Sequence, residues 1–374
     1  MRSSGGHRRN LVIGVAIALV VGAVVVLGTT GSGRSASPTT TTSSTIAGGP
    51  DTTVDTAPLK PTIIGTGKPL LGEPSGLSLL LVGYDGQLHH LDLDTGELDV
   101  THFSSTPGQE SQAWYLTDQG LVYSDGKALI LRTPDGAERT IKFSESTDSY
   151  NTFARASADQ IWAMTQSGLG TGLLLRIDLG TATVVERVPL GNAYLAGVDE
   201  SARPVLQLVD GTVWRLAADA TWSKLGSLQT RPIGHGLYLE TTCPQPPACA
   251  VEVRTADQRV LFTVPPLGTE YSQEVPAGAS NGTLTALVRA DGGGPNQAID
   301  VYGPDGAHVA KLDDFTLQYS QDGSGMSWSP DGVWLFWFGA IAVHAWRAGL
   351  DAPRTIDLSA LSIPMQRIAI TRSH

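Results

Sequence analysis

Charged residues are scarce in this chain of 374 residues: they make up 16% of it, and Asp and Glu outnumber Lys and Arg by 36 to 25. The excess of acids is larger in residues 61–374, where 20 basic residues stand against 34 acidic ones, a formal charge of −14. A surface with this charge repels the phosphate backbone of nucleic acids. We therefore expect no nucleic-acid partner, whereas a protein or glycan partner stays compatible with the composition.

Cysteine occurs only twice, as Cys243 and Cys249, separated by PQPPA. The first ends one predicted strand and the second begins the next, so a disulfide would join the two strands of a hairpin. Oxidation is favoured outside the cytoplasm, and closing so short a loop contributes about 2 kcal/mol. A redox or metal pair is the alternative, but the C-x-x-C spacing is absent. We predict a structural disulfide.

Motifs of catalysis and cofactor binding are also missing. The chain has no H-E-x-x-H zinc helix, and GTGK (65–68) lacks both the leading glycine and the Ser/Thr of a phosphate loop. We therefore predict no catalytic, cofactor-binding or metal-ligating residues.

Residues 11–28, LVIGVAIALVVGAVVVLG, form a long run without charge. As a helix, 18 residues span about 27 Å, close to the thickness of the hydrocarbon core of a bilayer. Three arginines precede the run and only Arg34 follows it closely, which places residues 1–10 in the cytoplasm and the rest of the chain outside. A cleaved signal peptide is the alternative, but its apolar region is usually shorter. We predict an uncleaved, single-pass signal-anchor helix in the cell membrane.

Residues 29–60 consist mainly of Thr, Ser, Gly, Pro and Ala. Their small apolar surface cannot offset the entropy lost on ordering, so we expect a disordered linker. Such a coil reaches roughly 30 Å, and its composition also suits a glycosylated stalk.

One pattern repeats seven times in residues 77–374: an apolar strand, a tight turn, a second apolar strand, a Gly/Asp turn and a shorter strand. LSLLLVGYDGQLHHLDLDTGELDVTHF (77–103) is the clearest copy, and a further short strand, such as SQAWYL (111–116), separates successive copies. The Gly/Asp turns fall at intervals of 41, 43, 41, 38, 48 and 43 residues, at Asp94, Asp135, Asp178, Asp219, Asp257, Asp305 and Ala348.

Four short antiparallel strands repeating every 40–45 residues are typical of the blades of a β-propeller. A β-sandwich is the alternative, but seven nearly equal periods are too many for one sandwich. We therefore predict an all-β, seven-bladed β-propeller over residues 61–374, preceded by the transmembrane helix and the linker. QRIAITR (366–372) is expected to complete the first blade, because closing the ring removes exposed strand edges; KPTIIG (60–65) is the alternative strand.

Two short stretches resemble known propeller families. Ser329-Pro330-Asp331-Gly332, followed by VWLFW (333–337), resembles the SPDG element of TolB-type and WD-repeat-like propellers, and LDLDTGE (91–97) is similar to the turn of quinoprotein-like and lactonase-like repeats. The resemblance covers residues 77–374 as a pattern and implies a fold more than an activity. The WD dipeptide of true WD repeats is missing, and Gly234-His235 is the one GH pair within the repeats.

HHLDLDTGEL (89–98) raises the question of a metal site, because two histidines and two aspartates stand within six positions. Strand alternation separates them, and Gly96 supplies the positive φ of a hairpin turn. A calcium loop requires further acids and a glycine that are absent. We expect scaffold here, with His89, Leu91 and Leu93 on one face and His90, Asp92 and Asp94 on the other.

Other candidate side chains are expected to have structural roles. Tryptophan recurs at equivalent places in the blades, where large rings fill the space between stacked sheets: Trp162 and Trp334 on second strands, Trp214 and Trp346 on third strands. The histidines His235, His308 and His344 belong to separate blades and could meet only at the channel.

These inferences predict a membrane-tethered extracytoplasmic propeller that acts as a non-catalytic binding or scaffolding module. Its partner would be a protein or glycan of the cell envelope, bound by loops on one face of the disc. The alternative is a propeller enzyme, lactonase-, quinoprotein- or glycosidase-like, with its site at the mouth of the channel. A sensor or accessory subunit of an envelope complex is a third possibility.

Overall fold

In the computed structural model of the chain, residues 57–374 form one compact unit. The structure describes residues 62–63, 65, 67–83, 86–103, 114–124, 128–141, 150–166, 172–191, 193–217, 219, 221–226, 230–245, 248–264, 277–290, 297–315, 325–339, 341–361 and 365–373. Within these residues, no helix has both the length and the apolar character needed to cross a bilayer. The predicted signal-anchor helix (11–28) and linker (29–60) lie outside the described residues and stay predictions.

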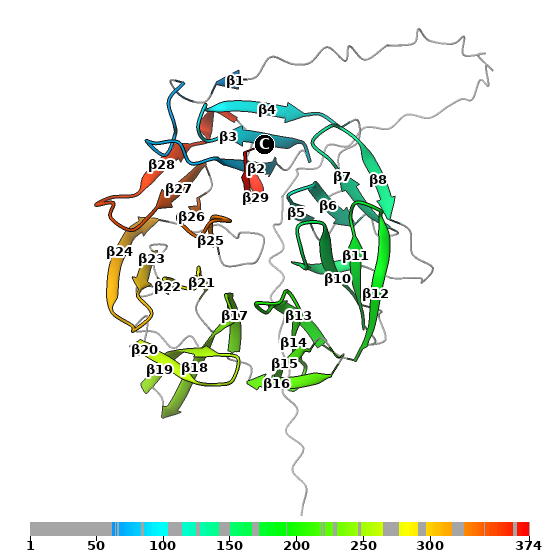
Figure 1. Cartoon of the computed structure of the whole chain (residues 1–374), viewed down its shortest axis with the longest axis vertical. Helices are drawn as coiled ribbons and strands as arrows, with labels where there is room; N and C mark the ends of the chain where they lie inside the picture. Colours follow the sequence, from blue (N-terminus) through cyan, green and yellow to red (C-terminus); the bar gives the residue numbers. More distant parts are fainter. Residues whose placement is uncertain are drawn as a thin grey trace, which may run out of the picture. The chain divides into compact units, whose positions relative to one another are not determined.

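Residues 57–374 form seven antiparallel sheets arranged in a ring, which confirms the predicted all-β, seven-bladed propeller (Figure 1). In each blade the strands lie side by side, from an innermost strand at the centre of the ring to an outermost strand at its circumference. Blade 1 holds β29 (Met365–Arg372), β2 (Leu77–Gly83), β3 (Leu88–Asp92) and β4 (Glu97–Thr101), with β1 (Thr62–Ile63) outside β4; blade 2 holds β5 (Trp114–Thr117), β6 (Gly120–Ser124), β7 (Leu129–Arg132) and β8 (Glu138–Ile141). Blade 3 holds β9 (Tyr150–Arg155), β10 (Gln160–Gln166), β11 (Gly172–Asp178) and β12 (Thr183–Leu190); blade 4 holds β13 (Ala193–Val198), β14 (Pro204–Leu208), β15 (Val213–Leu216) and β16 (Trp222–Gly226).

Blade 5 holds β17 (Thr230–Gly234), β18 (Leu237–Gln245), β19 (Ala248–Thr255) and β20 (Val260–Val264); blade 6 holds β21 (Gly278–Ser280), β22 (Thr285–Ala290), β23 (Gln297–Tyr302) and β24 (His308–Phe315); blade 7 holds β25 (Met326–Trp328), β26 (Leu335–Phe338), β27 (Ala342–Trp346) and β28 (Arg354–Asp357). A short 3-10 helix, η1 (Ser359–Leu361), follows β28.

The burial of a strand depends on its place in the blade. All seven residues of β2 and all four of β26 are buried, because neighbouring blades cover both faces of a second strand. The outermost strand β12 alternates between exposed and partly buried residues. This difference explains why second strands read as continuous apolar runs and fourth strands as alternating ones.

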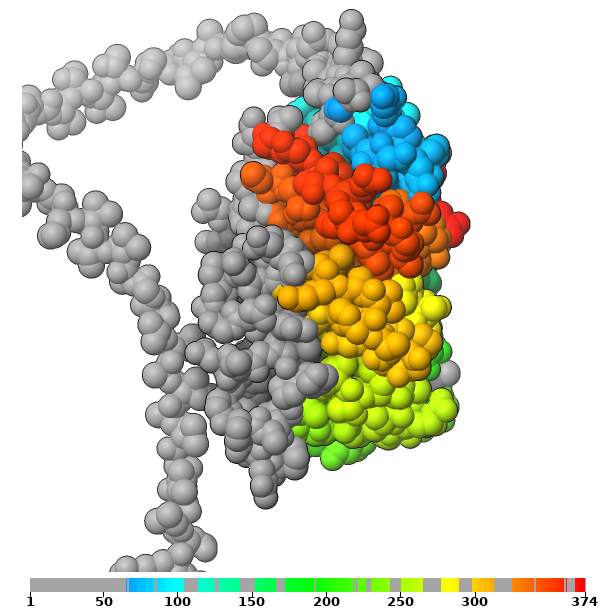
Figure 2. All heavy atoms as spheres, turned by 90° about the vertical axis from the view of Figure 1, so that its left-hand side faces the viewer, coloured from blue at the N-terminus to red at the C-terminus, as the bar shows by residue number. Residues whose placement is uncertain are grey.

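Among the described residues, the hydrophobic core forms seven clusters, and each joins two adjacent blades. In Figure 2, blades 5, 6 and 7 (lime, amber and red-orange) are seen from the side, each in contact with the next. The cluster between blades 4 and 5 is the smallest of the seven, with four buried residues: Val205, Val213, Leu225 and Tyr238. This interface therefore has the fewest buried apolar residues of the ring in the described part of the chain.

The C-terminal strand closes the ring, as the sequence predicts. β29 pairs antiparallel with β2 from Leu77 opposite Arg372 to Gly83 opposite Met365. The alternative segment also joins blade 1, but at the other edge, where β1 pairs with β4 over two residues. The first blade is therefore built from both ends of the propeller sequence.

The predicted turns between third and fourth strands are present in all seven blades. Most of the internal residues that the structure does not describe lie in two other kinds of connection. One kind joins the second strand of a blade to the third, and the other joins one blade to the next. The sequence prediction that loops on one face of the disc bind a partner names neither face, and it stays a prediction.

Candidate functional site

An arginine at or within two residues of the end of the third strand recurs in five blades, and each one lies within 4 Å of a carboxylate. In the sequence it stands a few residues from the predicted Gly/Asp turn, a regularity that the sequence analysis missed. The five residues are Arg132, Arg176, Arg215, Arg254 and Arg347.

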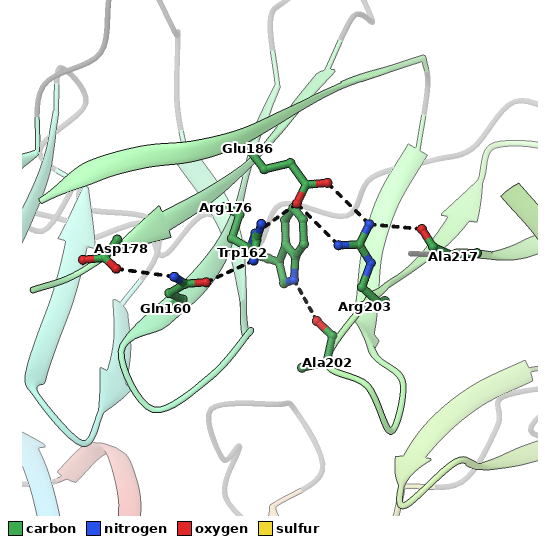
Figure 3. Close-up of polar contacts among 8 residues, drawn as sticks. All are labelled: Gln160, Trp162, Arg176, Asp178, Glu186, Ala202, Arg203 and Ala217. Carbon is green, nitrogen blue, oxygen red and sulfur yellow. Dashed lines mark hydrogen bonds and ion pairs between the residues drawn. The ribbon is translucent and has the colours of Figure 1, made fainter. Parts of the chain in front are cut away.

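The cluster between blades 3 and 4 shows what these arginines do (Figure 3). Glu186 on β12 binds Arg176 at 3.0 Å and Arg203, which precedes β14, at 3.4 Å. The indole of Trp162 lies near both guanidinium groups, 5.8 and 5.6 Å from its ring, and donates a hydrogen bond to the carbonyl of Ala202 at 2.9 Å. These contacts join blade 3 to blade 4, so the cluster is structural.

Two further clusters also connect different blades. Arg132 is fully buried, donates to Glu138 at 2.9 Å and to the carbonyl of Gly86 in blade 1 at 3.1 Å, and lies 4.5 Å from the ring of Phe103. Arg347 of blade 7 binds Glu73, which precedes blade 1, at 2.8 Å. A buried guanidinium requires a carboxylate partner because desolvation of an unpaired charge is costly.

Blade 4 is the exception, because its arginine is held loosely. Arg215 lies 3.8 Å from Asp199 and 3.7 Å from Glu200, whereas the shortest carboxylate contact of each of the other four arginines is 3.0 Å or less. Beside it a hollow of about 440 Å³ opens between blades 4 and 5, with His235 and Asp257 in its wall. These long distances from Arg215 to its carboxylates occur at the interface that has the smallest hydrophobic cluster of the ring.

Tyr238 lies in this interface with a buried hydroxyl that has no hydrogen-bond partner among the residues that the structure describes. Burial raises the pKa of the Tyr238 phenol well above its ordinary value, and the negative charges of Glu200 and Asp199 raise it further. The phenol therefore stays protonated, and burial of its unpaired hydroxyl opposes folding.

Tyr238→Phe is expected to leave the free energy of unfolding unchanged or to raise it by up to about 1 kcal/mol, because it removes an unpaired buried hydroxyl and keeps the ring. Equilibrium unfolding in urea measures the change. Tyr123→Phe is the matched control: the Tyr123 hydroxyl lies 3.4 Å from Glu138, so its removal lowers stability. A loss of stability in Tyr238→Phe comparable with that of the control would contradict the assignment.

A second hollow, here called the tryptophan groove, opens on the other side of blade 4, towards blade 3. It has a volume of about 270 Å³ and a mainly apolar wall. Trp222 is 36% exposed, and Val209, next to the groove residue Leu208, is 66% exposed. The wall includes Pro189 and Leu190 from β12 and Leu206, Leu208, Trp214 and Trp222 from blade 4.

The tryptophans follow the sequence prediction with one departure. Trp162, Trp334 and Trp346 are at most 3% exposed, as expected of core residues. Trp214 is only partly buried and lines the tryptophan groove instead. Trp222, which the sequence analysis did not single out, lies beside it on the neighbouring strand.

The stretch HHLDLDTGEL has the predicted alternation. His89, Leu91 and Leu93 are buried, and Gly96 has a φ of +74°. Asp92 accepts hydrogen bonds from the backbone N–H groups of Asp94 and Thr95, both at 2.8 Å. Partial burial alone would raise the pKa of Asp92, but the hydrogen bonds from Thr95 and Asp94 outweigh it and lower that pKa.

Asp94 has a similar role. It accepts hydrogen bonds from the backbone N–H groups of Ser75 and Gly76, at 2.6 and 2.9 Å. Both carboxylates thus hold turns of blade 1. In the part of the chain that the structure describes, no three His, Cys, Asp or Glu side chains gather closely enough to hold a metal ion.

The three candidate histidines are not brought together. His235 lies in the turn between β17 and β18, with a left-handed φ of +52°. His308 begins β24, an outermost strand, and its Nε2 lies 3.0 Å from Asp300. His344 on β27 stacks on Trp337 at 5.4 Å, and burial lowers its pKa.

A match to the G-x-S-x-G pattern, Gly278-Ala279-Ser280-Asn281-Gly282, is part of a hairpin. A nucleophile elbow requires a strand that turns into a helix, whereas here β21 turns into β22. Ser280 is 5% exposed, and its hydroxyl donates to the carbonyl of Leu284 at 3.2 Å. This serine therefore stabilises a turn.

The predicted disulfide stays a prediction. β18 and β19 form the expected hairpin, with Thr242 opposite Ala250, the neighbours of the two cysteines. The side chains of Cys243 and Cys249 lie outside the described residues.

Known proteins resemble this chain only distantly. No protein-family model matches the chain, and no curated protein matches it in sequence. Among solved structures, an oligogalacturonate lyase in complex with manganese has a TM-score of 0.49 and 14% identity, covering 80% of this chain and 96% of that one. A putative 6-phosphogluconolactonase from Bacteroides fragilis has a TM-score of 0.48 and 10% identity, covering 80% and 100%. TolB from Acinetobacter baumannii has a TM-score of 0.40 and 13% identity, covering 66% of each chain. At such identities the likeness is one of fold alone: the chain is similar to TolB and other β-propellers.

Proposed function

We propose that the protein is a membrane-tethered, extracytoplasmic β-propeller that binds a component of the cell envelope without catalysing a reaction. The tether rests on the apolar run at 11–28, the arginines before it and the polar linker that follows. The same features support the proposal that the partner is a component of the cell envelope.

One observation carries the binding role: the tryptophan groove exposes indole surface at the circumference of the ring. The other large aromatic and charged groups described above serve the packing of blades, as the cluster around Trp162 does. Exposed apolar surface in a hollow is typical of recognition sites. The groove is thus the described surface best suited to a partner.

The binding role is tested by co-sedimentation of the full-length protein, purified in detergent, with washed cell envelopes. Saturable binding that heat denaturation abolishes is the expected result. Binding that does not saturate would contradict the proposal. Release of soluble sugar or peptide from the envelopes during incubation would instead favour the propeller-enzyme alternative.

The location is tested separately with reporter fusions at the C-terminus. Alkaline phosphatase, which requires export, is expected to be active on the full chain, and a cytoplasmic fluorescent reporter is expected to be dark. The reverse pattern would place the propeller in the cytoplasm and overturn the tether.

A further inference from the structure

The tryptophan groove is built on one face of blade 4. Across the β15–β16 hairpin, Trp214 is opposite Lys224 and Leu216 is opposite Trp222. Trp214 and Trp222 are therefore diagonal neighbours on the same face of the hairpin. Val213 and Leu225 of the same two strands belong to the cluster with blade 5. The face with the tryptophans is thus turned to blade 3, where Pro189 and Leu190 form the opposite wall.

The indole of Trp214 is fixed by a chain of hydrogen bonds. Its Nε1 donates to the hydroxyl of Thr212 at 2.7 Å, and that hydroxyl donates to Asp210 at 2.6 Å. The backbone N–H of Thr212 also donates to Asp210, at 2.9 Å. An aromatic ring held in this way loses little conformational entropy when a ligand binds to it.

Trp214 connects the wall of the groove to one residue of each charge. Asp210 ends the hydrogen-bond chain, and Lys224 is the cross-strand neighbour of Trp214. The Lys224 ammonium interacts with the Asp210 carboxylate and contributes to lowering its pKa, after the hydrogen bonds from the hydroxyl and N–H of Thr212. Together they provide hydrogen-bond donors and acceptors without a net local charge.

From these contacts we infer that the tryptophan groove binds a sugar ring of a neutral glycan, with the pyranose stacked on Trp222 and Trp214. This inference rests on the proposed binding function and names its ligand class. The face of an indole carries negative charge and attracts the C–H groups of a pyranose. Asp210 and Lys224 supply partners for its hydroxyl groups.

Size and charge restrict the ligand further. A volume of about 270 Å³ lies below the range of roughly 300–1,000 Å³ typical of pockets for drug-sized molecules, so the groove suits a single ring of a longer chain. The formal charge of −14 over residues 61–374 disfavours an acidic polysaccharide. A neutral glycan satisfies both conditions.

The test uses the full-length protein in detergent and three kinds of probe: neutral oligosaccharides of glucose, galactose or mannose with four to six units, an oligogalacturonate of the same length, and an apolar peptide. Tryptophan fluorescence and calorimetry measure binding. At least one neutral oligosaccharide is expected to bind saturably, and Trp222→Ala is expected to weaken it about tenfold. Trp222→Phe should weaken it less, and Lys224→Met should weaken it by removing a hydrogen-bond donor.

Tyr194→Ala is the matched control, because Tyr194 is also an exposed aromatic residue of blade 4, at 51%, but lies outside the wall of the groove. It is expected to bind as the unchanged protein does. Thermal melting checks that every variant is folded. The inference is overturned if no neutral oligosaccharide binds, if Trp222→Ala binds equally well, or if the acidic oligosaccharide or the peptide is preferred.

Co-sedimentation with cell envelopes distinguishes the glycan site from the proposed binding function. Saturable binding to envelopes that Trp222→Ala leaves unchanged would overturn the glycan site and leave the proposed function standing. Loss of both envelope and oligosaccharide binding in the unchanged protein would overturn both.

Discussion

Deletion of residues 365–374 is expected to abolish the stable ring. β29 is the innermost strand of blade 1, and its removal leaves the wholly buried strand β2 as an unpaired edge. Ile368 and Ile370 also leave the cluster between blades 1 and 7. Each buried isoleucine contributes about 2–5 kcal/mol, so the loss is comparable with the roughly 5–15 kcal/mol that stabilises a typical domain. Circular dichroism during heating and size-exclusion chromatography measure the effect.

The matched control changes the other chain segment that joins blade 1. Replacing residues 61–64 by a Gly-Ser sequence removes only β1, which pairs over two residues at the outer edge. It is expected to lower the free energy of unfolding by about 1 kcal/mol or less, as the loss of one or two hydrogen bonds does. A C-terminal deletion variant that stays monomeric with an unchanged melting temperature would show that the ring does not depend on β29.

Trp162→Ala is expected to lower the free energy of unfolding by about 3–5 kcal/mol. Trp162 is fully buried, and its removal opens a cavity in the cluster between blades 3 and 4. It also leaves the carbonyl of Ala202 without its indole donor and takes the ring away from Arg176 and Arg203 (Figure 3). Equilibrium unfolding in guanidinium chloride measures the loss.

Trp222→Ala serves as the control for this second prediction. The same atoms are removed, but Trp222 is 36% exposed, so the expected cost is about 1 kcal/mol or less. Equal losses in the two variants would mean that the cluster around Trp162 contributes no more to stability than a surface residue does.

Much of the fold follows from local sequence. The Gly/Asp turns are visible because a tight turn needs a residue that tolerates positive φ, as Gly96 does, and an aspartate that accepts backbone hydrogen bonds, as Asp92 does. Buried second strands read as apolar runs such as LSLLLVG, which form because both faces are covered. The role of HHLDLDTGEL could be predicted for the same reason, since alternation and turn chemistry act within a few residues.

The candidate site could not be predicted in this way. Trp214 and Trp346 occupy third strands alike, yet Trp346 is 3% exposed and Trp214 lines a groove. The difference depends on which side chains of the neighbouring blade pack against each ring, and no single repeat specifies these. Arg347 and Glu73 are likewise far apart in sequence and meet only because the ring closes.

The sequence by itself therefore determined the number of blades, the places of their turns and the strand that closes the ring. The repeat number and the turns arise from backbone conformation and the burial of apolar side chains within one repeat, and the closing strand from the need to pair the exposed edge of the first blade. The tertiary structure decided which interfaces are tightly joined by arginine and which stay open, and which tryptophans are exposed. Those outcomes depend on contacts between side chains of different blades, and such contacts exist only after the sheets have stacked.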